Sequence, residues 1–287
     1  SIMKIMNDRL KQINHRLADP NDEPAVPKPA ATVLLVRDVE ERGIEVFLIE
    51  RAAKTNFGGA YVFPGGKVDL EDASGHLSEI CKGTSDKQAS AALGIKEGGL
   101  SYWVACIREC FEEAGILLAY RSDSRNFDPE DQEENLRFVS YRNRLNEGEP
   151  VLAEMCKKEE LFLATDRLAY LSHWITPKVE KRRYNTRFFV AQAPAGQDAI
   201  HDGSESVSSV WIKPEEALKQ QKKGKLLMIM PTMKNLESIC GYDNSKELLE
   251  DKNSINPYDI ATIEPKFFMK DGKYVGLLPG EKGYEDH

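Results

Sequence analysis

Long apolar runs are absent from this chain of 287 residues, and cysteine is scarce. No stretch approaches the roughly 18 consecutive apolar residues that a membrane-spanning helix needs, and we recognise no charged-then-apolar leader of the secretory type. The five cysteines include no CxxC pair, and their odd number argues against a disulfide framework or a zinc site. These absences predict an intracellular protein that does not bind membranes.

An excess of basic residues is missing as well. Acidic side chains outnumber basic ones by 47 to 39, and the resulting net charge of −8 argues against a nucleic-acid partner. The hydrophobic fraction of 41% and the charged fraction of 30% are ordinary for a globular protein, and the length allows one large domain or two small ones. The composition therefore predicts a globular chain that can bury a sizeable core.

The chain divides into three parts. Apolar residues recur at helical spacing over residues 2–17, which predicts an amphipathic docking helix. A mitochondrial leader is the alternative, but acidic residues in this region and the scarcity of serine argue against it. Four prolines within residues 18–30 then indicate an extended linker. We assign the helix and linker to 1–29, the main domain to 30–240, and an extension that packs on or near this domain to 241–287.

Hydrophobic periodicity predicts a mixed α/β chain. Six runs have the β-rich composition of strands, and they are residues 31–37, 44–51, 60–63, 168–174, 185–191 and 206–212. Residues 102–118 are strongly helical, with Gly115 near their end as a stop, and Pro214 followed by two glutamates is typical of a helix start. Strands that alternate irregularly with a few helices favour a mixed sheet covered by helices.

Residues 108–116, Arg-Glu-Cys-Phe-Glu-Glu-Ala-Gly-Ile, carry most of the chemical information. On a helix, Glu109, Glu112 and Glu113 fall within an arc of about 100°, opposite an apolar face. Because like charges one turn apart repel each other, a cation should compensate them, and clustered carboxylates suit a hard divalent ion such as Mg²⁺. The alternative is an acidic face that water simply solvates.

A second informative segment, Phe-Pro-Gly-Gly, lies upstream at residues 63–66. Together the two segments resemble the Nudix box: Gly, five residues, Glu, seven residues, then Arg-Glu-apolar-x-Glu-Glu-x-Gly-apolar. Gly66 and residues 108–116 match it, but Asp72 stands where the box has Glu. In addition, Arg108 follows Gly66 by 42 positions where the box allows 14, so 28 extra residues, at about 73–100, interrupt the box. The interruption resembles the one in the Nudix branch typified by a peroxisomal coenzyme A diphosphatase. Three further segments resemble the sequences of that branch, and they are residues 174–177, 182–189 and 230–232.

The resemblance implies a Nudix-type α/β/α sandwich with a mixed β-sheet and a metal-dependent hydrolysis of a diphosphate bond. It implies that Glu109, Glu112 and Glu113 hold Mg²⁺ or Mn²⁺, and that Glu109 or Glu205 takes the proton of the attacking water. Glu205 could equally be an ordinary loop glutamate. Arg108 is expected to orient a glutamate through a charge-assisted hydrogen bond.

The same resemblance suggests a substrate, coenzyme A or acyl-coenzyme A, which would give 3′,5′-ADP and (acyl-)4′-phosphopantetheine. Gly65 and Gly66 would approach the substrate closely, and Arg182, Arg183 and Arg187 could hold its phosphates, because Arg offers forked donors to phosphate oxygens. Surface salt bridges are the alternative for these arginines. Other pyrophosphate substrates such as ADP-ribose or NADH, and a non-catalytic nucleotide-binding module, also remain open.

Three remaining expectations concern aromatic residues, compartment and assembly. Tyr61, Phe63 and Trp174 could stack on an adenine or fill the core. The last residues, 284–287, lack a Ser-Lys-Leu-type peroxisomal address, so a cytoplasmic location is the default expectation. The expected partner is a small diphosphate substrate, and a homodimer is compatible with the sequence.

Overall fold

The computed structural model describes residues 16–55 and 57–287. The helix predicted over 2–17 therefore lies almost wholly outside the described residues. Across the described ranges, no helix combines the length and the apolar character that a membrane crossing requires.

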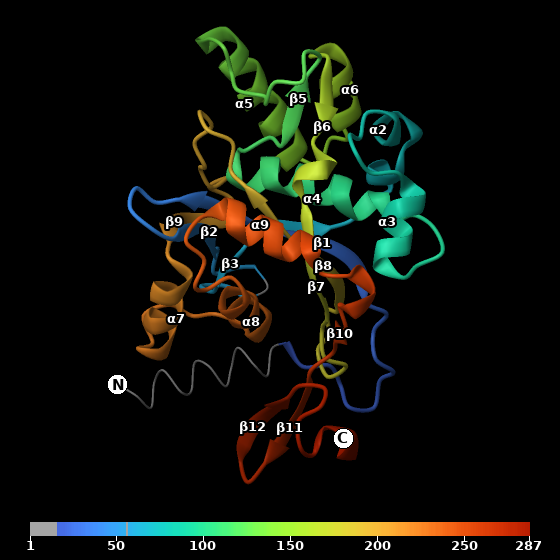
Figure 1. Cartoon of the computed structure of the whole chain (residues 1–287). Coiled ribbons are helices and arrows are strands. Elements are labelled where there is room, and N and C mark those ends of the chain that lie inside the picture. The colour runs from blue at the N-terminus through green and yellow to red at the C-terminus, as the bar shows by residue number, and fades with distance from the viewer. Residues whose placement is uncertain (1–15, 56) are drawn as a thin grey trace.

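A mixed sheet forms the centre of the described chain (Figure 1). Its strands are β1 (Lys28–Asp38), β2 (Ile44–Arg51), β3 (Tyr61–Val62), β4 (Gly65–Lys67), β7 (Ala169–Ile175), β8 (Tyr184–Gln192), β9 (Ser206–Ile212) and β10 (Thr262–Ile263). The order is β10-β7-β8-β1-β2-β3, while β4 pairs with β1 and β9 pairs with β2. The pairs β1–β8 and β10–β7 are parallel and the others are antiparallel. All six predicted runs are strands, so the predicted mixed sheet is confirmed.

Alternation along β1 explains the layers. Val33 and Leu35 are buried against α4 (Leu100–Ala114), whereas Leu34 and Val36 belong to the core on the opposite face of the sheet. That second core is covered by α7 (Pro214–Lys222), α8 (Met230–Ser238) and α9 (Ser245–Ser254). Because successive side chains of a strand point to opposite faces, one apolar strand supplies both cores. The result is the predicted α/β/α arrangement, with α4 on one side of the sheet and α7–α9 on the other (Figure 1).

The helix predicted over 102–118 is shorter at its carboxyl end. α4 ends at Ala114, and Gly115 follows in the left-handed conformation, with φ of 70° and its N–H bonded to the Phe111 carbonyl. Glycine adopts this conformation without a Cβ clash, so it ends the helix. The apolar run continues through the fully buried residues 116–118, which is why periodicity alone overextended the helix.

The residues that interrupt the box pack against the core of the domain. They contain α2 (Gly75–Glu79) and α3 (Asp86–Leu93), and Leu77, Ala89 and Leu93 are buried in the same core as α4. Beside them lie β5 (Ala119–Arg121), β6 (Leu161–Leu163), α5 (Gln132–Asn146) and α6 (Leu152–Lys158).

The C-terminal extension predicted over 241–287 takes part in the fold. Leu248 of α9 is fully buried in the second core, and β10 adds an edge strand beside β7. A separate hairpin of β11 (Lys266–Lys270) and β12 (Lys273–Leu277) follows. Residues beyond the predicted boundary at 240 therefore contribute to the sheet and to its second core.

Candidate active site

Three carboxylates on α4 form the centre of the site. Glu109 is 9% exposed and Glu113 is 4% exposed, so the two are buried rather than solvated, while Glu112 is half-buried beside them. Burial raises the pKa of Glu109 well above its usual range, and repulsion from Glu113 and Glu112 adds to the rise. Burial also raises the pKa of Glu113 to about 8, although Arg51 opposes the shift. Such a cluster is most stable when a positive charge compensates it.

The paired glycines bring the backbone against these carboxylates. Gly65 and Gly66 belong to strand β4, and the Gly65 N–H donates to Glu113 Oε2 at 3.0 Å. A Cβ on Gly66 would lie 2.3 Å from Glu109 Oε1, and one on Gly65 would lie 2.3 Å from the Thr32 hydroxyl oxygen. A side chain at Gly66 would therefore push β4 away from the helix, and one at Gly65 would push it away from β1.

Arg108 joins the two halves of the interrupted box. Its guanidinium donates to Oε1 of Glu109 and of Glu112, both at 3.0 Å, and also to the Lys67 carbonyl. The same group makes two hydrogen bonds to Asp72, which is 2% exposed. Burial raises the pKa of Asp72, and Arg108 opposes that rise. Asp72 thus contacts the arginine although its side chain is one carbon shorter than the Glu of the box.

Arg51, which the sequence analysis did not single out, links Glu205 to the cluster. Its Nη1 lies 3.6 Å from Glu113 Oε1 and 3.9 Å from Glu205 Oε2. The Ala52 N–H donates to the Glu205 carbonyl at 2.8 Å, which keeps the end of β2 beside this loop. The Glu205 side chain is 64% exposed and lines the cavity next to the cluster. An arginine ending a strongly apolar strand was the available signal for this contact.

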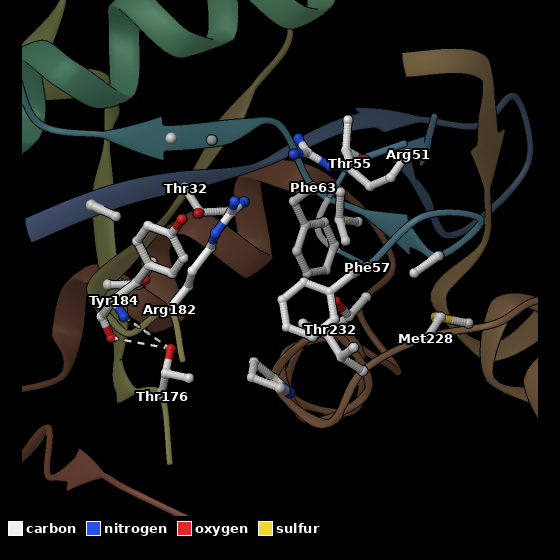
Figure 2. A pocket seen from close by; sticks show the side chains of 18 of the residues that line it. Thr32, Arg51, Thr55, Phe57, Phe63, Thr176, Arg182, Tyr184, Met228 and Thr232 are labelled. Carbon is white, nitrogen blue, oxygen red and sulfur yellow. Dashed lines mark hydrogen bonds between the residues drawn. The ribbon is translucent and has the colours of Figure 1, made fainter. Parts of the chain in front are cut away.

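A cavity of about 1160 Å³ extends from the carboxylates (Figure 2). Gly65, Gly66, Glu109, Glu112 and Glu113 line one part of it. Other parts are apolar, and their residues come from the β2–β3 and β3–β4 connections, β7, the α7–α8 connection, α8 and the C-terminal hairpin. They include Phe57, Phe63, Trp174, Met228, Met233 and Phe267. Phe63 and Trp174 are both buried and face the cavity, so they fill the core and line the site; Tyr61 is absent from the cavity wall and bonds to Glu50 instead.

Only one of the three predicted arginines reaches this cavity. Arg182 lines it, and its side chain extends past Tyr184 toward Thr32 (Figure 2). The prediction for Arg183 and Arg187 needs correction, since both are buried away from the cavity.

The two buried arginines have protein partners instead. Arg183 pairs with Glu264 at 2.8 Å, and Arg187 donates to the Tyr170 hydroxyl at 2.9 Å and the Leu93 carbonyl at 3.2 Å. Arg183 precedes β8, whereas Arg187 lies on it, and because alternate residues of a strand point to opposite faces, Arg187 faces away from the cavity that Thr186 lines.

The donor set fits a hard divalent cation by its chemistry, because it consists of three carboxylates on one buried helix face. In the arrangement seen across residues 16–55 and 57–287, no three acidic, His or Cys side chains converge as metal ligands do. Here Arg108 contacts one oxygen of Glu109 and of Glu112, and Gly65 contacts Glu113. The five cysteines are free thiols, and Cys106 and Cys110 are fully buried small side chains.

The fold and the site define a Nudix domain. A crystal structure of a NUDIX hydrolase from Alicyclobacillus acidocaldarius aligns with a TM-score of 0.66 at 21% identity, over 79% of this chain and 96% of that one, and this likeness confirms the fold. Residues 84–239 match the family model described as NUDT19 Nudix domain, and the chain belongs to this family.

Two similar proteins carry the same name. The acyl-coenzyme A diphosphatase NUDT19 of Xenopus laevis is 26% identical over 238 residues, which are 71% of this chain and 62% of the relative. The Gallus gallus protein of that name is 22% identical over 276 residues, covering 84% of this chain and 73% of the relative. The match to the Xenopus protein thus spans less than two thirds of its length.

Proposed function

We propose that this chain is a metal-dependent diphosphatase that hydrolyses coenzyme A or acyl-coenzyme A to 3′,5′-ADP and (acyl-)4′-phosphopantetheine. The observation that carries the proposal is the trio of carboxylates, buried Glu109 and Glu113 with half-buried Glu112, beside the Gly65-Gly66 strand in the wall of a large cavity. The names of the Xenopus and chicken relatives support the choice of substrate.

Glu109, Glu112 and Glu113 would hold Mg²⁺ or Mn²⁺, which when bound neutralises phosphoryl charge and lowers the pKa of a coordinated water. Arg108 positions two of these carboxylates through its hydrogen bonds to Glu109 and Glu112. Glu205 or Glu109 accepts the proton of the attacking water. The exposed side chain of Glu205 can reach a water in the cavity, and Glu109 lines the same cavity beside the other two carboxylates.

The charges around the cavity support a substrate with more than two phosphates. Lys54, Lys67, Lys181 and Arg182 all line it. Within the described part of the chain none of the four forms an ion pair, although acidic residues outnumber basic ones. Coenzyme A carries a 3′-phosphate in addition to its diphosphate, while ADP-ribose and NADH carry the diphosphate alone. The additional cations therefore favour coenzyme A.

The size and the apolar wall of the cavity support an acyl group. Ligand pockets usually measure about 300–1,000 Å³, and this cavity, at about 1160 Å³, exceeds that range. Methionine side chains, here Met228, Met230 and Met233, adapt to flexible apolar ligands.

The test is product identification with a panel of coenzyme A, acyl-coenzyme A, ADP-ribose and NADH, each with Mg²⁺ or Mn²⁺. We expect 3′,5′-ADP and the matching phosphopantetheine by mass spectrometry. Cleavage of ADP-ribose or NADH alone would overturn the substrate and leave the enzyme class. Binding of nucleotides without any turnover would support the non-catalytic module instead. The choice between Mg²⁺ and Mn²⁺, a cytoplasmic location and a homodimer stay predictions.

A further inference from the structure

The carboxyl end of α4 is held by side chains of α5. The Glu112 carbonyl accepts hydrogen bonds from Arg142 Nε at 3.0 Å and Asn146 Nδ2 at 3.2 Å. The Ala114 carbonyl accepts one from the Ile200 N–H at 2.8 Å. The last carbonyls of a helix have no partner within the helix, so these contacts satisfy groups that would otherwise need water. The end of the carboxylate-bearing helix is thereby fixed by two other segments.

Arg142 bridges those two segments. While its Nε donates to the Glu112 carbonyl, its Nη2 donates to the carbonyl of Ile200. A Cβ at position 115 would lie 2.9 Å from Arg142 Nη1, so Gly115 both ends the helix and leaves space for the guanidinium. The planar fork of arginine suits two carbonyls in this way, whereas a lysine would offer a single point of contact.

The segment that Arg142 holds is the connection between β8 and β9, residues 193–205. Gln197 fixes its first half, because its side chain bonds to both backbone groups of Leu117 and to the Phe127 carbonyl. Its second half carries Asp202 and Glu205 to the cavity wall. Ile200 lies between the two halves, so its contacts with α4 and Arg142 fix the position from which the second half, with Glu205, extends.

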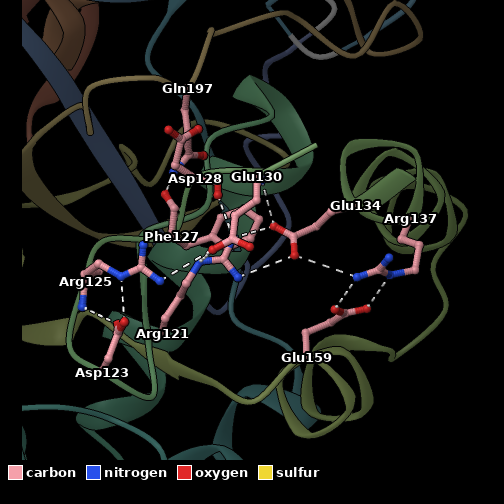
Figure 3. Close-up of polar contacts among 10 residues, drawn as sticks. All are labelled: Arg121, Asp123, Arg125, Phe127, Asp128, Glu130, Glu134, Arg137, Glu159 and Gln197. Carbon is pink, nitrogen blue, oxygen red and sulfur yellow. Dashed lines mark hydrogen bonds and ion pairs between the residues drawn. The ribbon is translucent and has the colours of Figure 1, made fainter. Parts of the chain in front are cut away.

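The helix that carries Arg142 is itself anchored by ion pairs (Figure 3). Arg121 pairs with Glu134 and also donates to the Asp128 carbonyl, and Arg137 makes two hydrogen bonds of 3.0 Å to Glu159. These pairs connect α5 to strand β5, which carries Arg121, and to the end of α6. Arg142 therefore lies on a helix that several ion pairs and hydrogen bonds hold in place.

We propose that Arg142 is a positioning residue that holds the 193–205 loop against the end of α4 and so keeps Glu205 beside Glu113 and Arg51. This inference rests on the proposed function for the role of Glu205, but the loop-holding role is a property of the protein alone. Arg142 does not line the cavity, so it acts through the loop rather than on the substrate.

Hydrogen exchange of the full chain without substrate or metal tests the holding role. We expect the Ile200 amide and its neighbours in 193–205 to exchange at least about 5-fold faster in Arg142→Ala than in the parent. Arg144→Ala is the matched control, because Arg144 lies on the same helix but binds Glu149, and its loop exchange should equal that of the parent. Unchanged exchange in Arg142→Ala overturns the proposal whether or not the protein hydrolyses coenzyme A.

A double-mutant cycle then tests whether Arg142 affects catalysis through Glu205. We expect Arg142→Ala to lower kcat about 10-fold with little change in KM, and to cost less than about 2-fold when Glu205 is already Gln. Equal losses in both backgrounds would overturn an effect through Glu205. If Arg142→Ala fails to fold, Arg142→Lys, which keeps the charge but lacks the fork, takes its place in both experiments. Full activity of Glu205→Gln with faster loop exchange in the Arg142 variant would retain the holding role and remove Glu205 from the proposed mechanism.

Discussion

The Asp72 carboxylate accepts two hydrogen bonds from the Arg108 guanidinium, at 2.9 and 3.0 Å, although 36 positions separate the two residues in the chain. The insertion between them folds into α2 and α3 and packs on α4 without displacing either partner. This pair therefore assembles the interrupted motif, and it fixes the arginine that in turn contacts Glu109 and Glu112.

Removal of one partner of this pair should be costly. We expect Asp72→Ala to lower the free energy of unfolding by about 3–5 kcal/mol, since the buried guanidinium would lose its principal counter-charge. Asp69→Ala is the control: Asp69 also approaches Arg108, at 3.3 Å, but it is exposed, and its loss should cost no more than about 1 kcal/mol. Urea denaturation of both variants measures the difference, and equal losses would contradict the assignment of Asp72.

The carboxylates can be tested separately from the fold. We expect Glu112→Gln to reduce kcat by at least about 100-fold while the far-ultraviolet circular dichroism stays that of the parent, because an amide is a weak ligand for a hard cation. Thermal unfolding adds a readout that needs no substrate. Mg²⁺ or Mn²⁺ at about 100 times its Kd should stabilise the parent by about 2.7 kcal/mol and the variant much less. Glu133→Gln, on α5, is the control. A Glu112 variant as active as the parent would remove Glu112 from the metal site.

His173 predicts a loss of stability in mild acid. Burial lowers the pKa of this histidine from 6.5 to about 4, and its ring contacts Thr262 of the edge strand β10 and Asn185 of β8. Because the unfolded chain takes up the proton first, the stabilising contribution is complete above about pH 6.5 and is lost as the pH falls toward about 4. The fall in Tm between pH 7 and pH 5 should thus be smaller in His173→Gln than in the parent. His76→Gln, at an exposed position, should retain the parental slope.

Local patterns predicted the elements, and motif spacing predicted the carboxylate trio, because strand alternation, helix periodicity and the box residues are all local properties. The contact of Arg51 with Glu205 depends on the antiparallel pairing of β2 with β9, which joins residues more than 150 positions apart, so the place of Arg51 at the end of an apolar strand does not identify its partner. For Arg187, alternation along β8 fixes only that it lies opposite Thr186, and only the completed fold decides which of the two faces borders the cavity.

Arg182 offers the sharpest test of the substrate. It lines the cavity without an ion pair in the described ranges, so its charge is available for a phosphate that is not the one being cleaved. We expect Arg182→Ala to raise KM for coenzyme A about 10-fold, as loss of a charge-assisted contact should. Dephospho-coenzyme A lacks the 3′-phosphate, so its KM should change less than about 2-fold. Lys222→Ala, an exposed change outside the cavity, should alter neither KM. Equal increases for both substrates would instead place Arg182 at the diphosphate, where the two compounds are identical.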